Sequence, residues 1–183
     1  VAAEDEKKEI LFDRLRAETL KQIMDPGWGR RLAVSFRMIQ TKNGLLKLGV
    51  RTEELDRVIQ EGKELAKWKL AELLREQFEE RATIGDLSSP AGELVEKKIR
   101  ATVGNLEKLG AKPTQEQLTQ IRDRANGKMF EIMLVELSEI QQGIRIHEIP
   151  YLRQREKIAL EVLGRVAKES KIHWQEAKRL VTT

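Results

Sequence analysis

The sequence predicts an all-α protein, and three observations support this prediction. Residues with high helix propensity (Leu, Glu, Lys, Arg, Ala and Gln) dominate the 183 positions, and only four positions are proline. Charged residues make up 35% of the chain and aromatic residues 4%, which is typical of long, well-solvated helices. Apolar residues recur at helical spacing through most of the chain. We therefore expect a multi-helix bundle or helical array of about seven to eight helices.

The first predicted helix covers residues 4–24, where leucines recur at roughly helical spacing. The tip DPGWG ends it, because proline removes a backbone donor and the glycines loosen the chain. A second helix is expected over residues 28–40, with Leu32, Phe36 and Ile39 on its apolar face. The following Lys42-Asn43-Gly44 is expected to interrupt it.

The longest predicted helix covers residues 53–81. Gly49 has the sequence position of the residue just past a helix end, and Thr52 that of an N-cap followed by two glutamates. Apolar residues form a continuous stripe along this helix, at Leu55, Val58, Ile59, Leu65, Ala66, Leu70, Leu73 and Leu74. The segment TIGDLSSP, residues 83–90, then predicts a loop.

The second half of the chain carries further helix boundaries. Ser89 and Pro90 are expected to open a helix that ends at Gly110, and Thr114 with Gln117 forms a capping box for the next. Asn126-Gly127 is expected to kink or divide that helix, whose second half, residues 128–142, is apolar enough to be central to the core. A last long helix is expected from Pro150 to about Ser170.

The loop at residues 83–90 suggests a division into two helical units. We expect residues 1–84 to form an N-terminal unit with the long acidic helix, and residues 85–183 a C-terminal unit, or the two to form one continuous domain. The segment KLGVRTEELDRVI resembles KLGAKPTQEQLTQI further on. This internal similarity indicates either a duplicated helical hairpin or a common way of joining helices.

The composition argues against several functional classes. The chain contains no cysteine, which excludes disulfides and thiolate chemistry and favours a cytoplasmic protein. No apolar run approaches the roughly 18 residues that span a membrane. The two histidines, His147 and His173, lack partners at metal-ligand spacing, and no phosphate-binding glycine loop is present. We therefore expect no enzyme activity, no cofactor and no membrane partner, and the first residue, Val1, suggests part of a larger protein.

A span without acidic residues is the strongest functional signal. Between Asp25 and Glu53 there is no acidic residue, and Trp28 and Phe36 lie among the cations. Such a span would suit phosphates, through charge pairing and counterion release. The alternatives are a solvated surface or a basic face that binds an acidic protein surface. The candidate phosphate-binding residues are Arg30, Arg31, Arg37, Lys42, Lys47 and Arg51.

The closing segment, residues 163–181, resembles a helix-turn-helix. Ala167 occupies the small-residue position, and Lys171 the turn position where glycine is expected. The packing positions are Ile172, Ala177 and Leu180. The resemblance implies that the residues exposed to DNA are His173, Trp174, Gln175, Lys178 and Arg179. Of these, Trp174 fits poorly at a DNA-facing position. A purely structural hairpin or a protein-docking surface would also match the pattern of the whole segment.

The expected function is therefore a non-catalytic nucleic-acid-binding accessory protein, of the replication, plasmid-transfer or packaging type. Its partner would be nucleic acid, with DNA favoured over RNA, and self-association is also compatible with the sequence. The candidate binding residues outside the acid-free span are His173, Gln175, Lys178 and Arg179. The alternative is a helical adaptor or assembly module that binds a protein partner.

Overall fold

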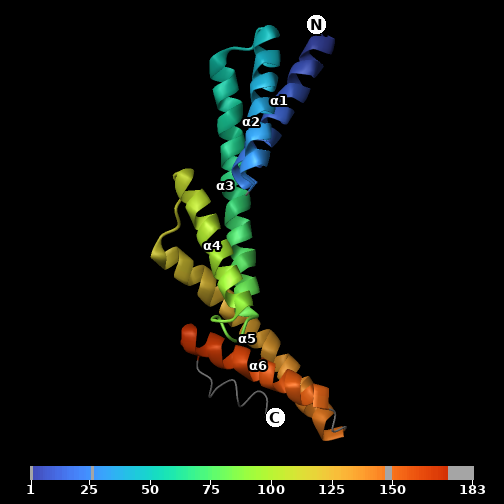
Figure 1. The fold of residues 1–183 in the computed structure, drawn as a ribbon, viewed down its shortest axis with the longest axis vertical. Helices are drawn as coiled ribbons and strands as arrows, with labels where there is room; N and C mark the ends of the chain where they lie inside the picture. Colours follow the sequence, from blue (N-terminus) through green and yellow to red (C-terminus); the bar gives the residue numbers. More distant parts are fainter. Residues whose placement is uncertain (1, 26, 147–149, 173–183) are drawn as a thin grey trace. The chain divides into compact units, whose positions relative to one another are not determined.

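A computed structural model describes residues 2–25, 27–146 and 150–172, and within these ranges it contains six α-helices and no strand (Figure 1). The all-α class is confirmed. The helices are α1 (Ala2–Met24), α2 (Trp28–Lys47), α3 (Thr52–Ala82), α4 (Pro90–Lys108), α5 (Gln115–Ile146) and α6 (Pro150–Glu169). The loop between α3 and α4 covers residues 83–89, as predicted.

The number of described helices is lower than predicted because two expected breaks are absent. Residues 42–44 continue α2 without interruption, since Thr41 and Leu45 on either side are both buried in the core. Asn126-Gly127 likewise lies inside α5, where Asn126 is 1% exposed and its amide donates to Glu169 of α6. In both places tertiary packing outweighs the low helix propensity of Asn and Gly.

Most of the predicted helix ends are confirmed in their hydrogen bonds. Gly49 and Gly110 both have positive φ, at 76° and 69°, just past the ends of α2 and α4. Val50 N–H then donates to the Leu45 carbonyl, and Ala111 N–H to the Leu106 carbonyl, which completes a Schellman motif at each helix end. The resemblance between the two KLG segments is explained locally, because both carry the same helix-ending motif.

The predicted N-caps are correct at two helices and wrong at a third. Thr114 Oγ1 accepts from Gln117 N–H at 3.1 Å and the Gln117 side chain accepts from Thr114 N–H at 2.8 Å, which is the expected capping box. Ser89 Oγ accepts from Gly92 N–H. Thr52, however, is the first residue of α3 and not its N-cap. The Glu54 carboxylate reaches back to Arg51 N–H at 3.4 Å, so Arg51 holds the cap position.

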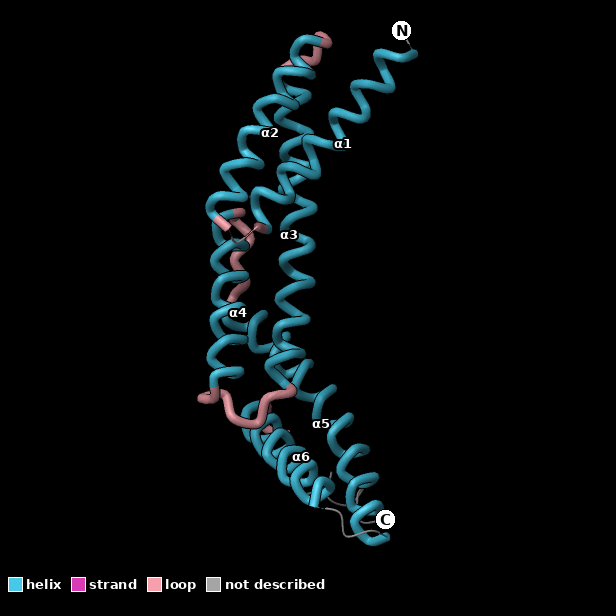
Figure 2. The backbone as a smooth tube through the Cα atoms, turned by 45° about the vertical axis from the view of Figure 1, so that its right-hand side comes forward, coloured by secondary structure: helices cyan, strands magenta, loops and turns pink. Residues whose placement is uncertain are grey.

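Two compact units make up the chain, and their boundaries fall inside helices. Unit 1 consists of residues 1–72 and 105–111, and unit 2 of residues 73–104 and 112–183. Figure 2 shows that α3, which contributes to both units, is one uninterrupted helix. The separate folding of residues 1–84 and 85–183 stays a prediction.

Unit 1 has a core between α1, α2 and the first part of α3. Its fully or nearly buried apolar residues are Leu15, Val34, Met38, Leu45, Val50, Leu55 and Val58. A buried polar contact crosses this core, since Thr41 Oγ1 donates to the Glu18 carboxylate at 2.9 Å. Gly62 of α3 allows close approach to α1, because a Cβ added there would lie 2.8 Å from the Cβ of Thr19. Close packing, this buried hydrogen bond and the ion pair between Arg16 and Glu61 at 2.7 Å therefore hold the three helices together.

The predicted apolar face of α2 is wrong. Leu32, Phe36 and Ile39 are 45%, 61% and 54% exposed, whereas Val34, Met38 and Leu45 are buried. Both sets recur at helical spacing, but α1 and α3 cover only the second one. We call the uncovered set, Leu32, Phe36, Ile39 and Leu46, the exposed stripe. Its existence means that α2 presents apolar surface to solvent.

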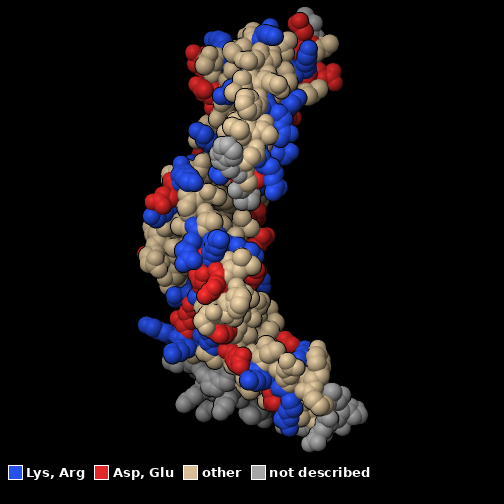
Figure 3. Space-filling model, viewed as in Figure 1, with Lys and Arg blue, Asp and Glu red and all other residues tan. Residues whose placement is uncertain are grey.

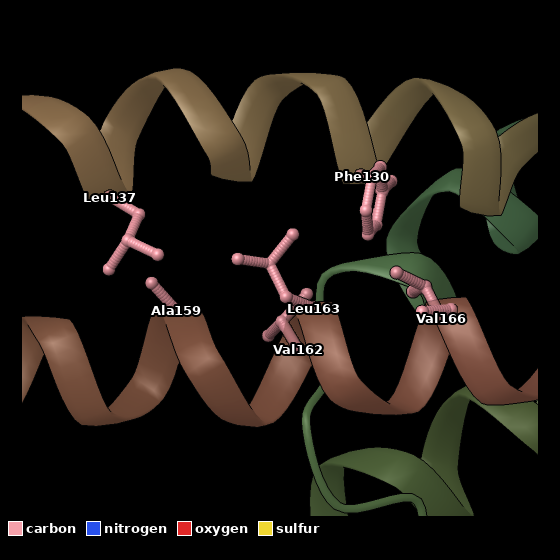
Figure 4. Close-up of a cluster of buried hydrophobic side chains, with 7 residues drawn as sticks. Phe130, Leu137, Ala159, Val162, Leu163 and Val166 are labelled. Carbon is pink, nitrogen blue, oxygen red and sulfur yellow. The ribbon is translucent and has the colours of Figure 1, made fainter. Parts of the chain in front are cut away.

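The core of unit 2 is packed between α5 and α6 (Figure 4). Leu137 of α5 points toward Ala159 of α6, while Leu163 lies between the two helices. Phe130 and Leu137 are buried as the apolar segment at residues 128–142 predicted. The long stripe of α3 is also confirmed for most of its residues, with Leu65 the exception at 41% exposed.

Candidate nucleic-acid interface

The six cations of the acid-free span lie on or beside α2 and mostly lack ion pairs. Arg30 is 3.7 Å from the Asp25 carboxylate, and its side chain is 79% exposed. The other five make no ion pair with any residue that the structure describes: Arg31, Arg37, Lys42, Lys47 and Arg51. In Figure 3, Lys and Arg side chains gather over the part of unit 1 where α1 ends and α2 begins. These charges are available to an external anion.

Helix geometry divides these cations between two sides of α2. Arg30 and Arg37 are seven residues apart and share one side. Arg31 and Lys42 are eleven residues apart, about three turns, and share another, next to the exposed stripe. The span is therefore not one flat basic face. A straight nucleic-acid backbone would contact one side at a time.

The N-terminus of α2 has one carboxylate beside it, that of Asp25, which accepts a hydrogen bond from the Gly27 N–H at 2.8 Å. Its N-cap, Gly27, provides no side-chain cap, and its first turn holds no acidic residue. By contrast, α3 has Glu53 and Glu54 in its first turn. The helix dipole, the free N–H groups, Arg30 and Arg31 are positive at this end, and the Asp25 carboxylate offsets part of that potential.

A cavity of about 420 Å³ lies against the first two turns of α2, entirely within unit 1. Among the described residues, its polar lining is cationic or neutral and includes no carboxylate. Inside it, Gln22 donates to Ser35 Oγ at 2.8 Å, and Ser35 Oγ donates to the Arg31 carbonyl at 2.9 Å. Arg31 Nε is buried without a hydrogen-bond partner. The lining residues are Gln22, Ile23, Arg31, Leu32, Ser35, Asn105, Lys108 and Leu109.

A second cavity, of about 200 Å³, lies at the other end of the exposed stripe. Ile39 and Leu46 line it together with Lys42 and with Asp56 from the start of α3. This cavity therefore contains both signs of charge. It suits an apolar side chain better than a phosphate.

Unit 2 contains a basic cleft that the sequence reading missed. Arg75 of α3 and Arg124 of α5 line a cavity of about 660 Å³ and form no ion pair with described residues. Lys128 in the same cleft is paired with Glu79 at 2.9 Å. The cleft joins helix α3, which is acidic overall, to α5, so no count of charge along the chain could have found it.

The closing segment is described only in its first half. Four candidate DNA-binding residues lie outside the described residues: His173, Gln175, Lys178 and Arg179. The turn before them matches the expected position, because Lys171 has a φ of 54°. Ile172 N–H donates to the Ala167 carbonyl at 2.9 Å, and Ile172 packs on the core of unit 2. The segment thus begins as a helix end with a Schellman-type bond.

A network of buried charges lies at the end of α3 in unit 2. Arg81, whose side chain is 10% exposed, forms a bidentate pair with Glu169 at 2.6 and 2.8 Å and also contacts Glu96. Arg165 contacts Glu169 and donates to the carbonyls of residues 81, 82 and 84. Burial alone would raise the pKa of Glu169, but hydrogen bonds from Arg81 and Asn126 and the nearby arginine charges lower it to about 2. These groups satisfy one another and leave no charge for a ligand.

Among the described residues, no group of three or more His, Asp or Glu side chains is placed to hold a metal ion. No described helix is long and apolar enough to cross a lipid bilayer. Comparison of the chain with protein-family models, with curated proteins and with solved structures gave no match.

Proposed function

We propose that the protein is a non-catalytic nucleic-acid-binding accessory protein that contacts phosphates through α2. The observation that carries the proposal is the acid-free span, in which five of the six cations form no ion pair with described residues. Phosphate binding would relieve the mutual repulsion of these cations and release counterions. The exposed Phe36, at 61%, provides a ring on which an unpaired base can stack.

Salt dependence tests this proposal. A duplex that contacts one side of α2 would make about three phosphate contacts with its cations. The affinity for a 20-base-pair duplex should therefore fall about 40-fold between 50 and 200 mM salt. The measurement is a fluorescence-anisotropy titration with duplex DNA, single-stranded DNA and RNA of one sequence. Absence of binding to all three at 50 mM salt would refute the proposal.

A matched pair of triple variants locates the contacts. Replacing Arg30, Arg37 and Lys47 with Gln removes three exposed cations of α2. Replacing Arg57, Lys63 and Lys69 with Gln removes three exposed cations of α3, where acidic neighbours are abundant. We expect the first variant to lose at least about tenfold in affinity and the second to lose less than about threefold, since counterion release depends on which charges meet phosphate. Equal losses would argue against a role for α2.

A second candidate function is a helical adaptor that docks a partner helix on the exposed stripe. The observation in its favour is the exposure of Phe36 and Ile39 on a helix whose other face is packed. A photo-crosslinking residue placed at position 39 in the native cell distinguishes the candidates. Adducts with one protein, retained after nuclease treatment, would favour the adaptor, whereas nuclease-sensitive adducts would favour nucleic-acid binding.

A further inference from the structure

The unpartnered nitrogen of Arg31 is the starting point. Arg31 Nε is buried and has no acceptor, although it is the donor of a permanently charged group. A buried donor without an acceptor costs about 1–3 kcal/mol, so native proteins usually provide one. Arg31 lines the cavity against the first two turns of α2. Nε itself is enclosed, so an anion in the cavity would meet the rest of the Arg31 guanidinium, and a small shift of this group toward the anion would give Nε an acceptor.

Two further donors of this cavity also lack a partner among the described residues. Lys108 forms no ion pair and Asn105 no hydrogen bond with any described residue, while Gln22 and Ser35 already bond to one another. No carboxylate of a described residue lines the cavity, so Arg31 and Lys108 have no counter-charge within that part of the lining. An anion with several acceptor oxygens would therefore match this lining.

A phosphate ester fits this lining better than a simple carboxylate. A phosphate can accept bonds from the Arg31 guanidinium, the Lys108 ammonium and the Asn105 amide through separate oxygens. Ile23, Leu32 and Leu109 line the same cavity and provide an apolar surface for the organic part of the ester.

We propose that this cavity is a phosphate-binding site, with Arg31 and Lys108 as the charged contacts and Asn105 as a hydrogen-bond donor. The inference rests on the proposed function and gives it a location, since a backbone phosphate of nucleic acid would occupy the cavity. A free nucleotide offers the same chemistry. The experiment below separates these two sources.

The Arg31 Nε–H resonance reports occupancy directly by NMR, and an Arg31→Lys variant assigns it by its loss. The probes are inorganic phosphate, thymidine 5′-monophosphate and a 20-nucleotide single-stranded DNA, added to the full chain. We expect all three to shift this resonance and the Asn105 side-chain amide, with the oligonucleotide acting at the lowest concentration. If none of the three shifts either resonance, the phosphate site is refuted.

Replacing Lys108 with Gln tests the charge without disturbing the fold, because Lys108 is exposed. We expect Lys108→Gln to weaken binding of the monophosphate about fivefold or more, and to reduce the salt slope for single-stranded DNA by about 0.7. Lys63→Gln, an exposed cation of α3 in the same unit, is the matched control and should change neither quantity. Equal effects of the two variants would overturn the assignment.

The failures of the site and of the proposed function are distinguishable. If the oligonucleotide binds and leaves the Arg31 resonance unmoved, the phosphate site is refuted and nucleic-acid binding stands. If thymidine 5′-monophosphate shifts the Arg31 resonance and the oligonucleotide does not bind, the cavity is a nucleotide site and the proposed function is refuted.

Discussion

Two groups of charged residues, one in each unit, differ in how they are paired. In unit 2, Arg81, Arg165 and Glu169 are largely buried and bond to one another and to backbone carbonyls. In unit 1, Arg31, Arg37 and Lys42 have no acidic partner among described residues, and the apolar residues beside them are exposed. Charge is part of the packing in the first case and remains available in the second.

This difference indicates where binding should be sought. A buried ion pair with all its hydrogen bonds made contributes to a defined fold and offers nothing to a ligand. Unpaired cations next to exposed apolar side chains have the composition of a single-strand binding surface. The net charge of each unit would not reveal which cations are unpaired, because both units contain many arginines and lysines.

Removing Arg81 should have the largest effect on stability. Arg81→Ala would leave Glu96 and Glu169 without their main partner, and breaking a buried pair on one side typically costs about 3–5 kcal/mol. Urea denaturation followed by circular dichroism measures the loss, and hydrogen exchange should locate it in α6. Arg37→Ala, an exposed cation of α2, is the control and should change stability by less than about 0.5 kcal/mol. Similar losses for both variants would contradict the contrast between the units.

Acid should destabilise the protein through the same network. The pKa of Glu169 is about 2 in the folded chain against a reference value of 4.5. Because the folded-state pKa is depressed, the carboxylate stabilises the fold fully above about pH 5, and this contribution is lost as pH falls through 4.5 toward 2. The contribution is at most about 3 kcal/mol. Glu169→Gln should lower stability at pH 7 and flatten the dependence between pH 5 and 2; an unchanged pH dependence would refute this assignment.

Several of the features predicted correctly are set by neighbouring residues. Gly49, Gly110 and the Thr114–Gln117 box end or begin helices through contacts within a few residues, so the local sequence contains the necessary chemistry. The buried face of α2 depends on distant contacts. Phe36 and Ile39 are more apolar than much of the stripe that α1 covers, and only the position of α1 decides between the two faces.

The candidate site was predictable in charge but not in geometry. The missing acids between Asp25 and Glu53 can be counted directly in the sequence. The cavity beside Arg31, however, also needs Asn105 and Lys108, which lie more than seventy residues further along the chain. The same is true of Arg81 and Glu169, whose pairing has no local signature.

The stability of unit 1 should depend on volume added between α1 and α3, whereas the stability of unit 2 should depend on its buried charges. Gly62→Ala places a Cβ 2.8 Å from Thr19 Cβ and 3.2 Å from the Arg16 carbonyl, so α1 and α3 must move apart, at a cost of about 1–3 kcal/mol. Gly164→Ala in α6 is the matched control, because nothing lies near its added Cβ. It should stabilise the protein by about 0.5–1 kcal/mol. Urea midpoints of the two variants should therefore move in opposite directions, and a shared direction would contradict the packing argument.

The smallest expected effect concerns the helix ends that both units contain. Lys171 takes a left-handed conformation at the end of α6, with a φ of 54°, where unit 1 uses Gly49 with a φ of 76°. A side chain in this conformation costs about 1–2 kcal/mol that glycine avoids. Lys171→Gly should therefore stabilise the protein by about 1 kcal/mol, and Gly49→Ala should destabilise it by a similar amount. Thermal melts of the two variants check both signs. If Lys171→Gly is neutral while Gly49→Ala is destabilising, the lysine side chain must contribute a stabilising contact that offsets its strained backbone.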